Sequence, residues 1–277
     1  MNNSFNQPVF EKDKDIRIPN WPNDADRIPD WIYTSESVYA RELNRIFLGP
    51  HWNYVGLECE ASSPGSYFRS YVGPFPVVVS RDSDGMLNVF ENRCAHRGVE
   101  FCREYRGTAG SFICPYHNWT YNLQGDLTAV PFRRGVKGKG GMPPNFDIQK
   151  HSLRKFRVET RGGVIFATAS NDTETIEDYL GPEICREFDA TFDGSEMKLL
   201  GLHRNILPNN WKLYQENLKD PYHATLLHTY LTTFGLFVSS NESRIPTDKH
   251  GRHGGLLSRR PEGRPNVSRD EQSNMQA

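Results

Sequence analysis

Two cysteines and two histidines between residues 94 and 117 have the types and spacing of metal ligands. They stand as Cys94-x-His96 and, after seventeen residues, Cys114-x-x-His117. Each pair is tight enough for one loop to present both side chains, so each loop supplies one thiolate and one imidazole. Two chemistries fit this set. One is a zinc ion held by all four side chains, and the other is a [2Fe-2S] cluster with two cysteines on one iron and two histidines on the other.

The residues around these pairs favour iron. Gly98 follows the first pair, Pro115 and Tyr116 lie inside the second, and Trp119 comes soon after it. Loops of this kind offer backbone N–H groups and an aromatic cover to the sulfurs, which is how a protein tunes the potential of a cluster. Spacing and flanks therefore favour the cluster and leave zinc and coincidence open.

The other three cysteines are interpreted as packing residues. The chain has five cysteines in all, an odd number, and its first twenty residues lack the apolar centre of an export signal. A disulfide framework is therefore disfavoured. Cys59, Cys102 and Cys185 are each predicted to serve as a small apolar residue in a core.

A second group of metal-ligand types is Asp220, His223 and His228. Its simplest interpretation is an amphipathic helix that happens to carry two histidines. On a regular helix, residues five apart point about 140 degrees away from each other, so the histidines converge only if the helix is distorted. Pro221 is placed to distort it, and Asp220 lies three residues before His223 on the same face.

Short alternating or β-branched runs separated by turns predict a small antiparallel β domain around the first group, from about residue 53 to 169. The clearest predicted strands are 66–73, 75–81, 87–92, 110–115, 119–125 and 162–169, with turns at 82–85 and 124–126.

Helices are predicted on both sides of this β domain. They cover 30–47, capped by Thr34 or Ser35; 172–188, interrupted at Gly181-Pro182; and 209–234, broken or kinked at Pro221. A strand is predicted over 197–207. The polar segment from about residue 239 to 277 is expected to be disordered or to pack on something beyond the end of the chain.

The segments CAHRG and CPYHNWTY, with VGPFPVVVSRDSDGMLNVFENR before them, resemble the Rieske domain of the α (large) subunits of ring-hydroxylating oxygenases. This resemblance implies that Cys94 and Cys114 hold one iron of a [2Fe-2S] cluster and that His96 and His117 hold the other. The same family marks its mononuclear iron site with E-N-x-x-D-x-Y-H-x-x-x-x-H, and here that signature runs from residue 216 to 228.

By the same resemblance, His223 and His228 are two arms of a 2-His-1-carboxylate site for Fe(II). Asp220 would orient a ligating imidazole and link to His117 of the partner subunit, which implies a trimer of α subunits with or without β subunits. The acids after His228 are Glu242, Asp248, Glu262, Asp270 and Glu271. None stands in a matching motif, so the chain is expected to be truncated before the carboxylate ligand.

The expected fold class is α+β, with a small antiparallel β Rieske domain followed by the start of a helix-plus-antiparallel-sheet catalytic domain. The expected division is a helical segment over 1–50, the Rieske domain over 51–165 and the incomplete catalytic domain over 166–277.

The resemblance implies a terminal oxygenase component that uses O2, and electrons from NADH delivered by a reductase with or without a ferredoxin, to hydroxylate an aromatic ring. FRRGVKGKGGMP and ENLKDPYHATLLHTYLTTFG are most similar to the group that acts on salicylate, anthranilate or terephthalate. The alternatives are a dioxygenase of another aromatic substrate and a Rieske electron-transfer protein without oxygenase activity.

The composition limits the remaining partners. The formal net charge is −1, and no run of 18 apolar residues occurs. A soluble, cytoplasmic protein is expected, without nucleic-acid or membrane binding. One local exception is residues 131–146, which carry Arg133, Arg134, Lys137 and Lys139. This segment is interpreted as a flexible surface loop, or alternatively as a docking patch for an acidic ferredoxin.

Overall fold

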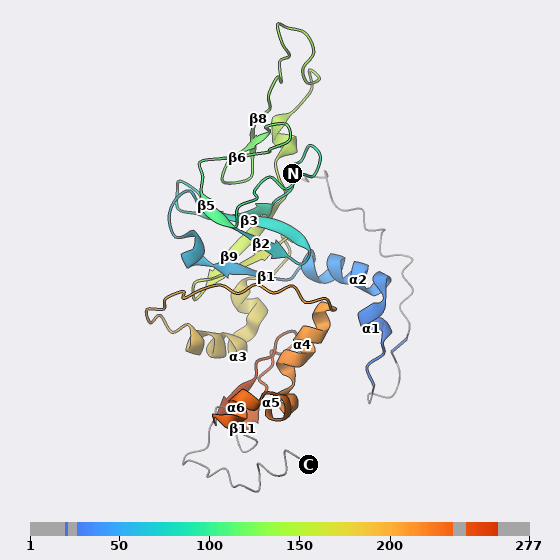
Figure 1. Ribbon diagram of the computed structural model, residues 1–277, viewed down its shortest axis with the longest axis vertical. Coiled ribbons are helices and arrows are strands. Elements are labelled where there is room, and N and C mark those ends of the chain that lie inside the picture. Colours follow the sequence, from blue (N-terminus) through green and yellow to red (C-terminus); the bar gives the residue numbers. More distant parts are fainter. Residues whose placement is uncertain (1–19, 22–26, 235–241, 260–277) are drawn as a thin grey trace. The chain divides into compact units, whose positions relative to one another are not determined.

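The computed structural model describes residues 20–21, 27–234 and 242–259 (Figure 1). The chain divides into two compact units. The first comprises residues 1–179 with 196–199, and the second comprises residues 180–195 with 200–277. Among the described helices, none combines the length and the apolar character needed to cross a membrane.

The first unit is built on a seven-stranded antiparallel sheet with the order β1-β10-β9-β4-β3-β2-β5. Its strands are β1 (Asn53–Leu57), β2 (Ser66–Val72), β3 (Phe75–Arg81), β4 (Leu87–Glu91), β5 (Arg106–Thr108), β9 (Lys155–Arg161) and β10 (Val164–Thr168). The strands predicted at 66–73, 75–81, 87–92 and 162–169 are confirmed. Six of the seven residues of β3 are buried, as expected for a strand covered on both faces.

Strand β3 separates two apolar cores because successive side chains point to opposite faces of a strand. Val77 and Val79 belong to one core, with Phe68 and Ile165 among its members. Val78 belongs to the other core, which contains these buried side chains: Phe90, Cys94, Phe101, Cys102, Phe112, Cys114, Trp119, Tyr121, Leu123, Leu127, Val130 and Leu153. Both cysteines of the Cys-His pairs are therefore part of a packed core.

A three-stranded sheet carries the second Cys-His pair. Its strands, in spatial order, are β6 (Phe112–Ile113), β7 (Thr120–Tyr121) and β8 (Leu127–Ala129). They are shorter than the predicted strands at 110–115 and 119–125 because residues 114–119 leave the sheet as a loop. The turn before β8 needs glycine at 125, where φ is +80° and an added Cβ would lie 2.9 Å from the Phe90 ring. The short helix η3 (Ile148–His151) then leads to β9.

The predicted helix over 30–47 is divided into α1 (Trp31–Thr34), α2 (Glu36–Glu42) and the π-helical turn η1 (Leu43–Phe47). Ser35 has extended dihedral angles and caps α2, because its hydroxyl accepts from the Val38 N–H at 3.4 Å. Helix η2 (Glu58–Ala61) follows β1 and carries Cys59. The prediction that Cys59 packs in a core is wrong, since this one-turn helix leaves its side chain exposed.

Helix α3 (Ile176–Thr191) has the interruption that Gly181-Pro182 predicts. Gly181 has φ +75° and ψ 163°, which divides the helix at that point. The strand predicted over 197–207 is wrong. Within the described residues this segment has no regular structure, and Leu200 and Ile206 are 92% and 96% exposed. Apolar content alone does not make a strand, because a strand also needs a neighbour for its backbone groups.

The predicted helix over 209–234 consists of α4 (Trp211–Lys219), α5 (Pro221–Leu227) and α6 (Thr229–Thr233). Asn210 caps α4, and Pro221 opens α5, so the break predicted at this proline is confirmed. Of the polar segment 239–277, residues 242–259 contain a hairpin of β11 (Glu242–Arg244) and β12 (Leu257–Arg259), and the remainder lies outside the described residues. Strands and helices occur in separate stretches, which confirms the α+β class.

Candidate metal centres

The two Cys-His loops, residues 94–99 after β4 and 114–119 between β6 and β7, share one backbone geometry. Cys94 and Cys114 each donate their N–H to the carbonyl five residues later, at 2.9 Å in both loops. Each cysteine carbonyl accepts from the N–H four residues later, which belongs to Gly98 or Asn118. These two residues have φ of 69° and 55°, which Gly and Asn adopt most readily. Two different sequences therefore fold into matching loops.

The loops bring the two imidazoles together above two buried thiols. His96 Nδ1 and His117 Nδ1 lie 3.1 Å apart, with ring centroids at 4.6 Å. Cys94 and Cys114 are only 2% and 1% exposed. Two thiols on the core side and two facing imidazole nitrogens on the outer side match the donor set of a two-iron cluster with mixed ligation.

Tyr121 is a functional candidate that the sequence did not single out. Its hydroxyl accepts from the Ala95 N–H at 3.1 Å and lies 3.2 Å from Cys94 Sγ. Either atom of this contact can be the donor, and toward a thiolate at Cys94 the Tyr121 hydroxyl would donate. Burial raises the pKa of Cys94, whereas the hydrogen bonds from Tyr121 and from the His96 N–H act in the opposite direction. The same two donors would stabilise a metal-bound thiolate at Cys94.

Aromatic rings cover both histidines. Trp119 stacks on His96 with centroids 4.9 Å apart and an interplanar angle of 9°. Tyr116 packs on His117 at 3.8 Å, and Arg97 lies over the Tyr116 ring at 5.7 Å. Burial, together with the charges of His117 and Arg97, lowers the pKa of His96 and favours the neutral imidazole that binds metals.

Cys102, the third cysteine of this region, packs beside the site as predicted. It is buried in the same core, and burial raises the pKa of its thiol to about 11, so it stays protonated. Its backbone is held by Asn92, which donates to the Cys102 carbonyl at 2.8 Å and accepts from its N–H at 3.0 Å. The Asn92 side chain thus joins the two ends of residues 92–102, the segment that contains the first Cys-His loop. Cys185 is also buried, as predicted.

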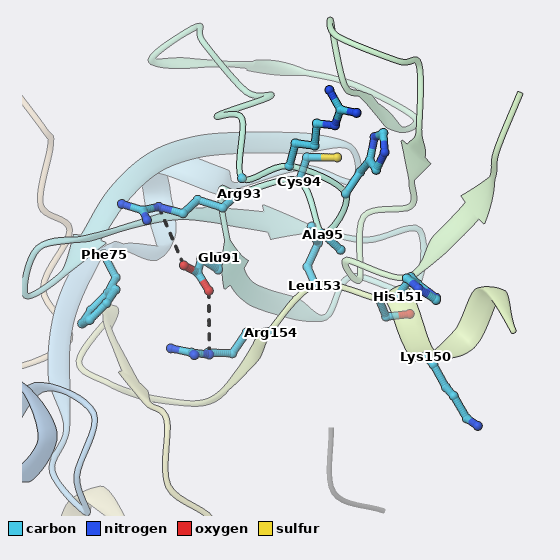
Figure 2. A pocket seen from close by; sticks show the side chains of 13 residues that line it. Phe75, Glu91, Arg93, Cys94, Ala95, Lys150, His151, Leu153 and Arg154 are labelled. Carbon is cyan, nitrogen blue, oxygen red and sulfur yellow. Dashed lines mark ion pairs between the residues drawn. The ribbon is translucent and has the colours of Figure 1, made fainter. Parts of the chain in front are cut away.

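A cavity of about 460 Å³ opens beside the first Cys-His loop (Figure 2). Glu91 lies in its wall, with one carboxylate oxygen 3.9 Å from Arg93 and the other 3.7 Å from Arg154. Burial raises the pKa of Glu91, and the two arginines oppose that shift. The cavity is lined by Phe75, Glu91, Arg93, Cys94, Ala95, His96, Arg97, Gly98, Lys150, His151, Ser152, Leu153 and Arg154.

In the second unit, the helix breaks bring the second group together. His223 Nε2 and His228 Nε2 lie 3.2 Å apart, and Asp220 Oδ2 lies 3.2 Å from His223 Nδ1. Two imidazole nitrogens bound to one metal at about 2.1 Å and at a right angle lie about 3 Å apart. The two histidines therefore fit adjacent positions on one metal ion. Asp220 contacts the opposite edge of the His223 ring, which suits it to orient that ring.

Pro221 breaks the helix as predicted, but this break is not the one that brings the histidines together. Pro221 precedes both histidines, so it separates α4 from α5 and does not bend the segment between them. The break that matters is at His228, between α5 and α6. Asn217 is a contact that the sequence reasoning missed, because its side-chain amide lies 3.0 Å from His223 Nε2.

Neither Glu242 nor Asp248 joins this pair in the described structure. Glu242 is exposed on β11, and the buried Asp248 accepts from the N–H groups of His250 and His253. Within the described ranges, no three His, Cys, Asp or Glu side chains form a group able to hold one metal ion. Glu262, Asp270 and Glu271 lie outside those ranges.

Comparison with known proteins agrees with this geometry. Residues 51–140 match the Rieske [2Fe-2S] domain family. The chain is 49% identical to the salicylate 5-hydroxylase large oxygenase component of Ralstonia sp over 94% of its length and 62% of the relative's. It is 46% identical to the anthranilate 1,2-dioxygenase large subunit of Burkholderia cepacia, over 86% of this chain and 56% of that one.

Among solved structures, naphthalene 1,2-dioxygenase from Rhodococcus sp. bound to indole superposes with a TM-score of 0.73 at 29% identity, over 86% of this chain and 54% of that chain. The chain thus spans roughly three-fifths of the length of the relatives named above.

A Rieske [2Fe-2S] domain is therefore the class that the first unit defines. More specifically, over most of its length the chain is similar to large subunits of Rieske aromatic ring-hydroxylating oxygenases, among them the salicylate 5-hydroxylase, anthranilate and terephthalate enzymes. The predicted family is confirmed.

Proposed function

We propose that Cys94 and Cys114 hold one iron of a [2Fe-2S] cluster and that His96 and His117 hold the other. The observation that carries this proposal is the matched pair of loops, with two buried thiols and Nδ1 atoms 3.1 Å apart. A four-ligand zinc ion would use the same residue types, but residues 51–140 match a family defined by the cluster. Two neutral imidazoles in place of thiolates make the cluster easier to reduce than an all-cysteine cluster.

For the second centre, we propose a mononuclear Fe(II) held by His223 and His228, with Asp220 as a positioning residue. The support is the 3.2 Å approach of the two Nε2 atoms and the contact of Asp220 with the far edge of the His223 ring. An iron of this kind supplies the activation of O2. We propose that within the chain Asp220 restrains the His223 ring from its Nδ1 edge, and that in an assembly it reaches His117 of the partner subunit.

The activity proposed for the whole protein is hydroxylation of an aromatic carboxylate such as salicylate, as the terminal oxygenase of a multicomponent system. The support is the similarity to relatives named for salicylate, anthranilate and terephthalate. Electrons would come from NADH through a reductase, with or without a ferredoxin. The proposed assembly is a trimer of α subunits with or without β subunits. The proposed domains of this chain are a helical segment over 1–50, the Rieske domain over 51–165 and the incomplete catalytic domain over 166–277.

The experiment that tests the cluster is reconstitution of the full chain with iron and sulfide. We expect two irons and two sulfides in the first unit and a rhombic EPR signal on reduction. His96→Ala and His117→Ala should abolish that signal. His203→Ala, which changes an exposed histidine, is the matched control and should retain it. A colourless wild-type protein that binds one zinc would refute the cluster.

The second centre is tested by adding Fe(II) to the cluster-loaded chain. We expect one further iron, which is lost in a His223→Ala/His228→Ala variant whose cluster spectrum is unchanged. Product analysis with salicylate, anthranilate or terephthalate, O2 and a reduced partner then identifies the substrate. A chain that exchanges electrons, binds only the cluster and forms no hydroxylated product would favour the alternative of a Rieske electron-transfer protein.

A further inference from the structure

Residues 132–142 form a built hairpin, although the sequence indicated a flexible loop. Val136 and Lys139 exchange two backbone hydrogen bonds of 3.0 Å, and the Met142 N–H donates to the Arg133 carbonyl at 2.9 Å. Gly135 has φ +75°, and an added Cβ there would lie 2.4 Å from the Lys139 carbonyl oxygen. The hairpin projects beyond β8 at the top of the first unit in Figure 1. We call residues 132–142 the basic hairpin.

All charged side chains of the basic hairpin are cations, and it also exposes apolar side chains. It carries Arg133, Arg134, Lys137 and Lys139, and residues 131–146 contain no Asp or Glu. In the described part of the chain, no ion pair joins these four cations to a carboxylate. Phe132 is 74% exposed and has φ +55°, a strained conformation for a bulky residue. Arginine with exposed aromatic residues is the composition of a protein-binding surface.

Ring contacts connect the base of the hairpin to His96. The Arg133 guanidinium lies 5.8 Å from the centroid of Phe146, and Phe146 packs on Trp119 at 6.0 Å. Trp119 in turn stacks on His96. Phe146 also stacks on His151 at 4.5 Å, and His151 lines the cavity described above. Side-chain contacts therefore link the basic hairpin to Trp119, which stacks on His96, and to His151, which lines the cavity.

The cavity continues the positive charge of the hairpin. Arg93, Arg97, Lys150 and Arg154 line it, against the single carboxylate of Glu91. Its wall includes His96 but not His117. We call this cavity the cationic pocket.

We propose that the basic hairpin and the cationic pocket together bind an acidic electron-transfer protein, which delivers electrons to the cluster on its His96 side. This inference rests on the cluster of the proposed function. In the transfer step, the reduced [2Fe-2S] cluster of the partner loses one electron, and one ferric ion of this chain's cluster becomes ferrous. No bond is formed or broken between the proteins.

Three observations favour an acidic redox protein as the occupant. The positive charge surrounds the approach to a cluster ligand, where it steers an oppositely charged partner to the redox centre. The exposed side chains of Phe132 and Val136 add apolar contact area that a purely ionic partner would not use. His117 lies outside the pocket and packs on Tyr116, so it stays available for onward transfer while the partner occupies the His96 side.

The test measures both binding and electron transfer with the cluster-loaded full chain. The probe is an acidic plant-type [2Fe-2S] ferredoxin, used oxidised for calorimetric Kd and reduced for stopped-flow kinetics. Arg134→Glu/Lys139→Glu should weaken Kd and lower the second-order reduction rate at low salt by about tenfold. Lys150→Glu, at the pocket, should lower the rate by about threefold. All differences should vanish near 1 M salt, where the Debye length is about 3 Å.

Arg27→Glu/Arg41→Glu is the matched control, because it reverses the same number of charges in the N-terminal segment and should leave Kd and rate within twofold. Dithionite should reduce the cluster of every variant, and the reduction potential of the cluster should be the same in all of them. Equal rates for the hairpin and control variants, or a hairpin variant that changes self-association or duplex DNA binding instead, would overturn the docking surface. A wild-type chain without a Rieske spectrum would instead refute the proposed function, and the two failures are therefore distinguishable.

Discussion

The two candidate centres differ in how the protein builds them. In the first unit, Cys94 and Cys114 are almost fully buried, and matched backbone hydrogen bonds fix both loops. In the second unit, α4 has no buried residue, and His228 is exposed. The cluster site is thus held by a core around it, whereas the His223–His228 pair is held mainly by the helix breaks beside it. We therefore expect substitutions near the first centre to change cluster content or unfolding free energy. Substitutions near the second centre should change mainly its affinity for Fe(II).

The largest expected effect is loss of the cluster on removal of a buried thiol that faces it. Cys94→Ala should lower iron and sulfide content about tenfold or more, because one iron would lose one of its two thiolate ligands. Cys102→Ala is the matched control, since it removes a thiol from the same core. It should retain the cluster and cost about 1 kcal/mol of unfolding free energy. Iron and sulfide analysis with urea unfolding checks both, and equal cluster loss in the two variants would contradict the assignment.

A second effect concerns the turn after β3, where Asp82 accepts a hydrogen bond from Gln124 in the turn before β8. Asp82 is buried, and burial alone would raise its pKa. The hydrogen bonds from Asn88, Gln124 and the backbone outweigh that effect and lower the pKa below 3.8. Because the folded pKa is lowered, the stabilisation is present above about pH 3.8 and is lost as pH falls through the folded pKa. Asp82→Asn should therefore cost about 2 kcal/mol at pH 7.

Urea unfolding of wild type and Asp82→Asn from neutral to acid pH checks this prediction. The difference between the two proteins should shrink toward acid. A difference that stays constant down to the lowest pH would mean that the carboxylate charge contributes nothing. Asp193→Asn is a suitable control, because that carboxyl is fully exposed and its pKa is lowered only by contacts with Ser195 and its own backbone.

In the second unit, Asp220→Asn should lower Fe(II) affinity about tenfold, since residues that orient a metal-binding histidine typically contribute 10- to 100-fold. The cluster spectrum should not change, and iron should still bind at saturating Fe(II). In an assembled oxygenase the same variant should slow electron transfer to the mononuclear iron. Calorimetric titration with Fe(II) checks the affinity. An unchanged Kd, together with a normal transfer rate, would remove Asp220 from the site.

The smallest effect is expected for Tyr121→Phe, which removes the hydroxyl 3.2 Å from Cys94 Sγ. Loss of one hydrogen bond worth about 1 kcal/mol should lower the reduction potential of the cluster by about 40 mV, because the bond stabilises the more negative reduced state. Protein-film voltammetry measures the shift. Tyr71→Phe, on the far part of β2, is the control and should leave the potential unchanged, and equal potentials for all three proteins would contradict the role of Tyr121.

Some predictions succeeded because their causes are local. Strand β3 was predicted correctly from its continuous apolar residues, and the division of α3 was predicted correctly from the Gly181-Pro182 dipeptide. The errors came where a neighbour decides the outcome. Residues 197–207 are apolar enough for a strand but have no strand beside them in the described structure, and Cys59 is exposed because its short helix lies outside the sheet.

The sequence by itself determined the ligand types, their spacing and the family, because these follow from residue identity along the chain. It could not show that Gly98 and Asn118 close matching loops, that the Tyr121 hydroxyl lies against Cys94 Sγ, or that the break at His228 brings two imidazoles together. Nor could it show that four cations of the basic hairpin lead to a pocket with His96 in its wall. Some of these features are local backbone conformations and others are distances between residues far apart in the chain, and both are set only by the folded backbone.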